Sequence, residues 1–114
     1  MIARHWRGWT SRENADAYER LLRTEILPGI RTRLEGTDYR GVILMRRDPP
    51  DGAGEVEFAT LMFFDSLDTV RAFAGEDYEH GVVPPAARAL LARFDERSTH
   101  FAADVMPGAR LDPG

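Results

Sequence analysis

The chain has 114 residues, a net charge of −4, no cysteine and no lysine, so that all 15 basic residues are arginine. This length suits one domain with a core of its own, and an acidic balance without a basic block argues against nucleic acid or an anionic membrane as a partner. The composition excludes disulfides, thiolate chemistry and a lysine Schiff base. The absence of a charged-then-apolar leader and of a long apolar run predicts a cytoplasmic protein with no membrane partner.

The segment 2–9, IARHWRGW, alternates like a strand but carries cations and a titratable ring among its apolar residues. Successive side chains of a strand point to opposite faces, so Arg4 and His5 lie on different faces, and the alternation fits either assignment. If this strand lies inside the sheet, one of the two points beneath the covering helices. A buried cation there needs a partner or a wet pocket, because an unpaired buried charge is very costly.

The next elements follow from caps and periodicity. Thr10 begins TSRE, a capping-box pattern, and predicts a helix that ends at LPGI, because Pro28 disfavours helix at the residue before it. The remaining predictions are strands over 39–47 and 55–65, a helix over 67–74, a short helix over 84–94, a strand over about 96–105 and a loose tail over 106–114.

This element order, βαββαβ, is that of the ferredoxin-like split βαβ motif. We therefore predict an α+β fold with an antiparallel sheet of order 4-1-3-2, helices on one face and a single domain over 1–105. In this order the first strand lies inside the sheet, between the third and the last.

The two middle strands are apolar on both of their sides. Val42 and Leu44 oppose Ile43 and Met45, and only one side can be covered by the helices of this chain. Because a bare apolar sheet face is unfavourable in water, we expect a homodimer in which two sheets meet face to face.

Three stretches, IARHWRGWT, FFDSLDTVRAFAGEDYE and THFAADV, resemble the antibiotic biosynthesis monooxygenase family over residues 1 to about 105. The resemblance implies a dimeric α+β barrel with a pocket between the helices and the sheet of each copy. It does not fix the reaction, because the family includes cofactor-independent oxygenases of polyketide pathways, haem-degrading enzymes and quinol oxygenases. Its haem-degrading branch uses an asparagine, a tryptophan and a histidine where this chain has His5, Phe73 and the stretch around Val83. The resemblance therefore implies no haem, and we expect no cofactor.

Four residues are candidates for acid–base work: His5, His100, Arg4 and Arg7. The first and last strands should be antiparallel neighbours, which makes the two histidines cross-strand or diagonal neighbours. A sheltered imidazole can take a proton near neutral pH, and a nearby arginine can hold the resulting oxyanion. The alternative is structural, with each histidine hydrogen-bonded in the core.

For the arginines, the structural alternative is an ion pair with an acid such as Glu57 or Asp104. The aromatic residues can stack on a flat ligand or belong to the core; they are Trp6, Trp9, Phe64, Phe73 and Tyr78. No metal site is expected, since the histidines are far apart in sequence. The DYEH stretch at 77–80 is either a pocket lid or a solvated loop.

The function we expect is that of a cofactor-independent monooxygenase acting on a small aromatic or polyketide-like substrate. Two alternatives remain open. One is a non-catalytic protein that binds a small aromatic ligand, and the other is a cofactor-free isomerase, cyclase or lyase that uses the same proton-transfer groups.

Overall fold

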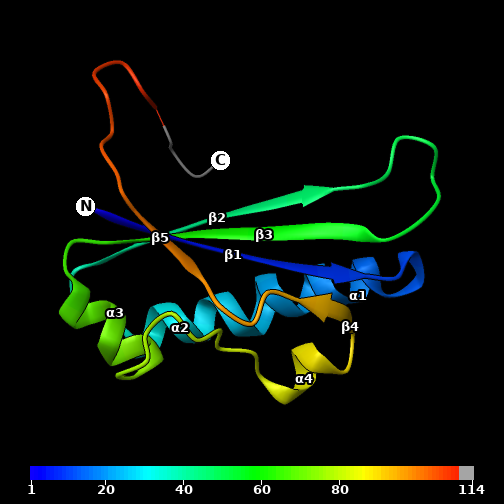
Figure 1. Ribbon diagram of the computed structural model, residues 1–114, viewed down its shortest axis with the longest axis horizontal. Helices are drawn as coiled ribbons and strands as arrows, with labels where there is room; N and C mark the ends of the chain where they lie inside the picture. Colours follow the sequence, from blue (N-terminus) through cyan, green and yellow to red (C-terminus); the bar gives the residue numbers. More distant parts are fainter. Residues whose placement is uncertain (111–114) are drawn as a thin grey trace.

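The computed structural model describes residues 1–110, which form a twisted antiparallel sheet with helices on one of its faces (Figure 1). The predicted antiparallel α+β fold is confirmed. In chain order, the elements are β1 (Ile2–Thr10), α1 (Arg12–Leu21), η1 (Leu22–Ile26), α2 (Leu27–Arg33), β2 (Tyr39–Arg47), β3 (Val56–Phe64), α3 (Leu67–Ala74), α4 (Pro85–Arg88), β4 (Leu91–Phe94) and β5 (Thr99–Ala102). Within the described residues, no helix has both the length and the apolar character needed to cross a membrane.

The strands are ordered β2-β3-β1-β4, and β5 also pairs with β1. β1 therefore lies inside the sheet, with β3 along one side and the two short strands β4 and β5 along the other. Arg4 is opposite His100 of β5, and Gly8 is opposite Phe94 of β4. The single last strand predicted over 96–105 is thus observed as the shorter β5.

The predicted helix over 84–94 is wrong beyond Arg88, where the chain turns into β4. β5 pairs with β1 only from Ile2 to His5, so it supplies no partner for the backbone at the far end of β1. β4 pairs with that far end. Unpaired buried backbone groups are costly, so the sheet edge overrides the local preference of this segment for helix.

The first helical stretch runs without a break from Arg12 to Arg33 and does not end at Pro28 as predicted. A π-helical turn, η1, precedes α2, and the backbone N–H of Leu27 bonds to the carbonyl of Leu22. Pro28 falls in the first turn of α2. A proline lacks the N–H of a normal helix, and the changed hydrogen-bond pattern of η1 lets the helix continue past it. The helix begins at Ser11, whose Oγ accepts from the Asn14 N–H, and not at Thr10, which is buried at the end of β1.

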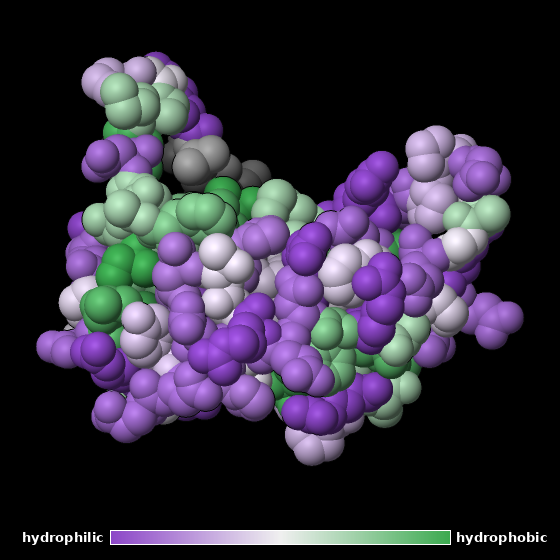
Figure 2. Space-filling model, in the orientation of Figure 1, coloured by the Kyte–Doolittle hydropathy of each residue, from purple (hydrophilic) through white to green (hydrophobic). Residues whose placement is uncertain are grey.

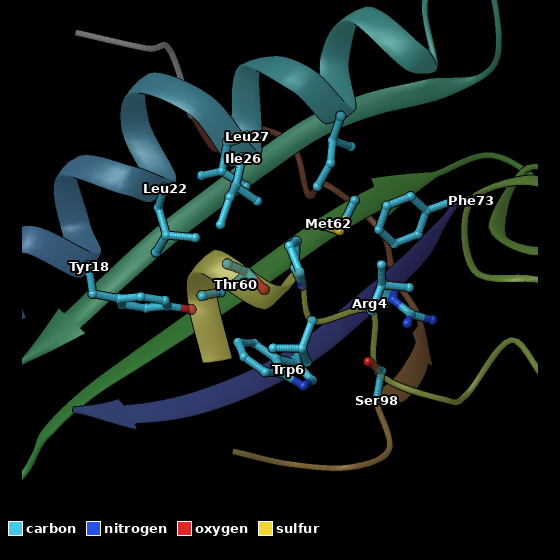
Figure 3. Close-up of a pocket in the computed structure, with 15 residues that line it drawn as sticks. Arg4, Trp6, Tyr18, Leu22, Ile26, Leu27, Thr60, Met62, Phe73 and Ser98 are labelled. Atoms are coloured by element: carbon cyan, nitrogen blue, oxygen red, sulfur yellow. The ribbon is translucent and has the colours of Figure 1, made fainter. Parts of the chain in front are cut away.

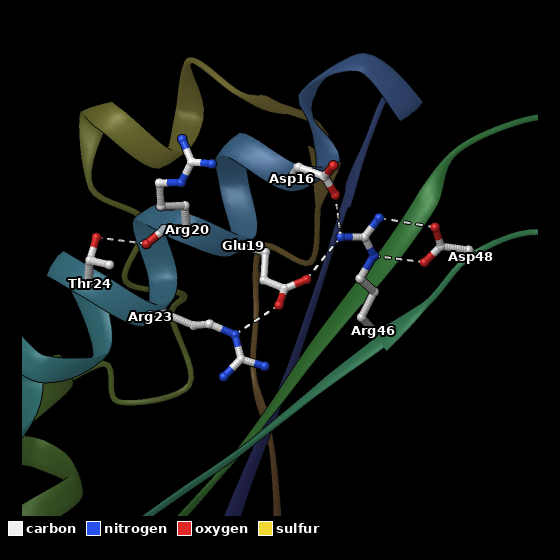
Figure 4. Close-up of polar contacts among 7 residues, drawn as sticks. All are labelled: Asp16, Glu19, Arg20, Arg23, Thr24, Arg46 and Asp48. Atoms are coloured by element: carbon white, nitrogen blue, oxygen red, sulfur yellow. Dashed lines mark hydrogen bonds and ion pairs between the residues drawn. The ribbon is translucent and has the colours of Figure 1, made fainter.

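The helices bury even-numbered side chains of β3 in two apolar clusters. The first contains Ala15, Tyr18, Leu22, Val56, Phe58 and Ala87, and the second contains Leu34, Met62, Phe64, Val70 and Phe73. On the outside, Arg46 of β2 ties α1 to the sheet through ion pairs with Asp16 and Glu19 at 2.8 and 2.9 Å (Figure 4).

The other face of the sheet carries no helix (Figure 1). We call it the open face. Its apolar side chains include Met45 and Phe101, which are 40% and 52% exposed. The β2–β3 loop and the segment 103–110 both rise on this side, and Figure 2 shows apolar residues at the foot of the second arm. In the expected tail, residues 106–110 are exposed around a turn closed by the Ala109 N–H and the Met106 carbonyl, and 111–114 lie outside the described residues.

Candidate functional site

A pocket lies between the sheet and the helices, below the first helical stretch (Figure 3). Its walls are mostly aliphatic and aromatic, and its free volume is about 50 Å³. The lining side chains are Arg4, Trp6, Tyr18, Leu22, Ile26, Leu27, Ile30, Thr60, Met62, Phe73, Val82, Val83, Pro84, Ala87 and Ser98.

β1 supplies the polar end of this pocket. Because side chains alternate along a strand, Arg4 and Trp6 share the face that the helices cover, and both line the pocket. Figure 3 draws Arg4 and Ser98 at the same end of the pocket and Tyr18 at the other. The question that the sequence left open is answered here: Arg4 lies beneath the helices and is 3% exposed.

The Arg4 guanidinium is held by neutral groups. It donates to the backbone carbonyls of Tyr78 and His80, the latter at 3.0 Å, and its Nη1 lies 3.0 Å from Nε2 of His100. Within residues 1–110 it makes no ion pair with a carboxylate, so the expected pairing with Glu57 or Asp104 is wrong for Arg4. Burial lowers the pKa of Arg4 to about 10, which leaves it cationic at neutral pH.

His100 lies behind Arg4 and does not line the pocket. Its ring packs edge-on against Tyr78, with centroids 5.2 Å apart. Burial and, to a smaller extent, the charge of Arg4 lower the pKa of His100 below its usual value, so the imidazole is neutral at pH 7. An arginine can only donate, so Nε2 accepts from it and the ring proton is on Nδ1. Nδ1 is buried, and no partner is found for it in the described chain.

Ser98 is the site residue that the sequence analysis missed. It is 3% exposed, lines the pocket, and its Oγ has no hydrogen-bond partner among residues 1–110. Its spacing of two from His100 was the available signal, because residues two apart on a strand share a face. Nothing else in the sequence distinguishes this serine from the helix-capping ones.

The segment from Gly75 to Pro84 forms another wall of the pocket through Val82, Val83 and Pro84. It contains no helix or regular strand. Besides the bonds from Arg4, two backbone hydrogen bonds attach it to the chain before β5. The Ser98 N–H donates to the carbonyl of Glu79 at 2.6 Å, and the N–H of Gly81 in the wall donates to the carbonyl of Glu96 at 2.8 Å. The DYEH stretch predicted as a lid or loop belongs to this wall.

Three of the other predicted residues lie on the open face: His5, Arg7 and Trp9. His5 is opposite Leu61 of β3 and Thr99 of β5, so the prediction that His5 and His100 are neighbours on one face is wrong. Arg4, not His5, is opposite His100, and an offset of one residue from a direct pairing of the two histidines puts their rings on opposite faces. Arg7 forms an ion pair, but with Asp95 at 2.9 Å.

The predicted aromatic residues are also divided. Trp6 and Phe73 line the pocket, and Tyr78 borders it through its contacts with Arg4 and His100. Phe64 is fully buried in the core, 6.3 Å from the ring of Phe73. Trp9 stacks beneath Arg93 outside the pocket, at 3.8 Å.

The described residues contain no cluster of three or more His, Asp or Glu that could hold a metal ion. The chain matches no family model, no curated protein and no solved structure.

Proposed function

We propose that this protein binds a small, largely apolar molecule, such as a single-ring aromatic compound, in the pocket between the helices and the sheet. The observation that carries the proposal is a buried cation at the end of an otherwise apolar pocket. Arg4 is 3% exposed and has only neutral partners among residues 1–110. Pockets of this kind, apolar with a few convergent polar groups, are the usual form of small-molecule sites.

The present volume sets a condition on binding. About 50 Å³ is free, whereas a cavity of about 150 Å³ is needed for a single benzene ring. An aromatic ligand must therefore displace part of the lining, and the wall from Gly75 to Pro84 is the segment without helix or regular strand. We expect ligand binding to change the environment of this wall.

The test is a thermal-shift screen of small aromatic and aliphatic compounds, followed by two-dimensional NMR of the protein with those that stabilise it. The expected result is saturable shifts at amides of the pocket lining and of segment 76–84. Failure of every compound to stabilise the protein or shift these amides, up to its solubility limit, would contradict the proposal.

A second candidate function is cofactor-independent oxygenation, and the pair of Arg4 and His100 favours it. A neutral imidazole beside a cation is the arrangement that removes a proton and holds the resulting anion. The substrate anion would supply the electrons itself: one oxygen atom of O₂ enters the substrate and the other leaves as water. Because His100 does not line the pocket and its Nε2 accepts from Arg4, the guanidinium must move aside before the imidazole can reach a proton of the substrate.

Oxygen uptake with anthrone and quinol substrates tests this candidate. We expect uptake in the unaltered protein and its loss in His100→Gln. Loss in His5→Gln but not in His100→Gln would assign the chemistry to the open face instead. Turnover under strict anaerobiosis would indicate an isomerase, cyclase or lyase, which needs no oxygen.

We also infer that the sheet and its helices form a ferredoxin-like unit, two of which pair through their open faces as a dimeric α+β barrel. Support comes from the apolar side chains of that face, Ile43, Met45, Leu61, Phe63 and Phe101, since a large exposed apolar patch is typical of an interaction surface. The two raised arms flank this patch. Sedimentation at micromolar concentration should give about twice the chain mass of 12.9 kDa, and a single species at 12.9 kDa would contradict the inference.

A further inference from the structure

We propose that the polar end of the pocket is a carboxylate site, in which Arg4 and Ser98 recognise the acid group of a small apolar monocarboxylic acid. This inference rests on the proposed function, because it names the chemical class that the same pocket would take. It commits to an anion with one charge and two acceptor oxygens.

The first argument is a count of donors. A guanidinium carries five N–H groups and no acceptor. Arg4 uses two of them on Nη1, toward the Tyr78 carbonyl and Nε2 of His100, and one on Nη2, toward the His80 carbonyl. One N–H on Nη2 and the one on Nε therefore have no partner among residues 1–110. Two donors are what the two oxygens of a carboxylate accept in a bidentate pair.

The second argument is charge. The groups bonded to Arg4 are two carbonyls and a neutral imidazole, which solvate the cation without neutralising it. Removing a cation from water without a counter-charge is costly, and a bound anion would supply that counter-charge. A neutral alcohol or amide of the same shape would accept the same hydrogen bonds but would leave the charge uncompensated.

The third argument is Ser98. Its hydroxyl is buried and lines the same end of the pocket, with no partner in the described chain. Nearly all buried polar atoms in native proteins are hydrogen-bonded. A hydroxyl that donates to a ligand oxygen explains why a serine is present here, where an alanine would bury no unpaired atom.

The acid–base chemistry of the ligand selects a carboxylate over a phenol. A carboxylic acid is ionised at pH 7, whereas a phenol, with a pKa near 10, is ionised in only about one molecule in a thousand. The apolar walls formed by Leu22, Ile26 and Phe73 fit the remainder of such an acid. A phosphate ester, which carries up to two charges and a larger hydration shell, would meet only one cation here.

Isothermal titration calorimetry with matched ligands tests the inference: benzoate against benzamide, and butyrate against butanamide for the smaller volume. The unaltered protein should bind each acid at least tenfold more tightly than its amide. Ser98→Ala should weaken acid binding about three- to tenfold and amide binding by less, because a hydrogen bond to a charged acceptor is the stronger one. Ser66→Ala, which alters a serine that caps α3 away from the pocket, is the matched control and should keep the acid preference.

Arg4→Gln should abolish the acid preference. If that variant does not fold, since Arg4 also holds the wall at Tyr78 and His80, the comparison between Ser98→Ala and Ser66→Ala decides alone. Amides that bind as tightly as acids would overturn the carboxylate site and leave the proposed function in place. Binding of neither class would overturn both, and acid binding that is unaffected by Ser98→Ala would place the anion elsewhere and overturn the inference.

Discussion

Replacing Ser98 by alanine should make the protein more stable. The hydroxyl is buried without a partner among the described residues, and an unsatisfied buried polar group costs about 1–3 kcal/mol. Alanine keeps the Cβ and removes only the oxygen, at a position that already faces free volume, so the loss of packing is small. We expect the free energy of unfolding to rise by about 1 kcal/mol, which corresponds to about 4 °C in Tm for a domain of this size.

The control variant, Ser66→Ala, should change the free energy of unfolding in the opposite direction. Ser66 caps α3, accepts from the Thr69 N–H and donates to Asp38 at 2.6 Å, so Ser66→Ala should lose about 1 kcal/mol. In urea unfolding at equal slope, the midpoints of the two variants should differ by about 1 M, taking a slope of about 2 kcal/mol per M. A Ser98→Ala variant as destabilised as Ser66→Ala would refute the reasoning, since it would mean that the hydroxyl is satisfied in the folded protein.

Three further predictions concern other parts of the molecule. Arg46→Met should lose about 1 kcal/mol of stability in low salt. The loss should be smaller in 1 M NaCl, because salt screens the exposed ion pairs of Arg46. An equal loss at both salt concentrations, measured by urea unfolding, would assign the effect to packing. Burial, and then the charge of Arg4, lower the pKa of His100, so below pH 6.5 the unfolded chain binds more protons and stability falls as the pH drops. His100→Gln should reduce that fall between pH 7 and 5 in thermal unfolding, and an unchanged pH dependence would contradict the assignment. Phe58→Ala should cost about 3–5 kcal/mol, because its ring is buried edge-on against Tyr18 at 4.9 Å, and a urea midpoint close to that of the unaltered protein would show that the core does not depend on it.

The elements with complete local signals were predicted well from the sequence. β2 and α3 have the predicted bounds, and α3 carries both its serine cap and a glycine at its end, where Gly75 takes a φ of 93°. Such a φ is readily adopted only by glycine. These signals act within a few residues, so no knowledge of distant contacts is needed to read them.

The predictions from sequence were wrong where contacts between distant parts of the chain determine the local structure. β4 forms because the far end of β1 needs a partner, which no local pattern indicates. The helix continues past Pro28 because η1 changes the hydrogen-bond pattern ahead of it, and that change is not visible in composition. The centres of two predicted strands do not fix the register between β1 and β5: Arg4, not His5, is opposite His100, so the two histidines lie on opposite faces.

The site itself was partly predictable. Arg4, Trp6 and Phe73 were among the expected residues, and they line the pocket. Ser98 was not, because its spacing of two from His100 was the only signal, and that spacing alone does not indicate a pocket residue. Its role depends on the absence of a partner, a property that only the folded arrangement displays.

The alternation of β1 has a consequence for how this chain can change over time. Even-numbered positions such as Arg4 and Trp6 meet the pocket, and odd-numbered positions such as His5 and Trp9 meet the opposite side. Substitutions at even-numbered positions can alter the pocket, and substitutions at odd-numbered positions can alter the open face. The pocket and the open face can therefore change independently, although both depend on the same nine-residue strand. An inserted or deleted residue within the strand would exchange both at once, which makes its length far less tolerant of variation than its composition.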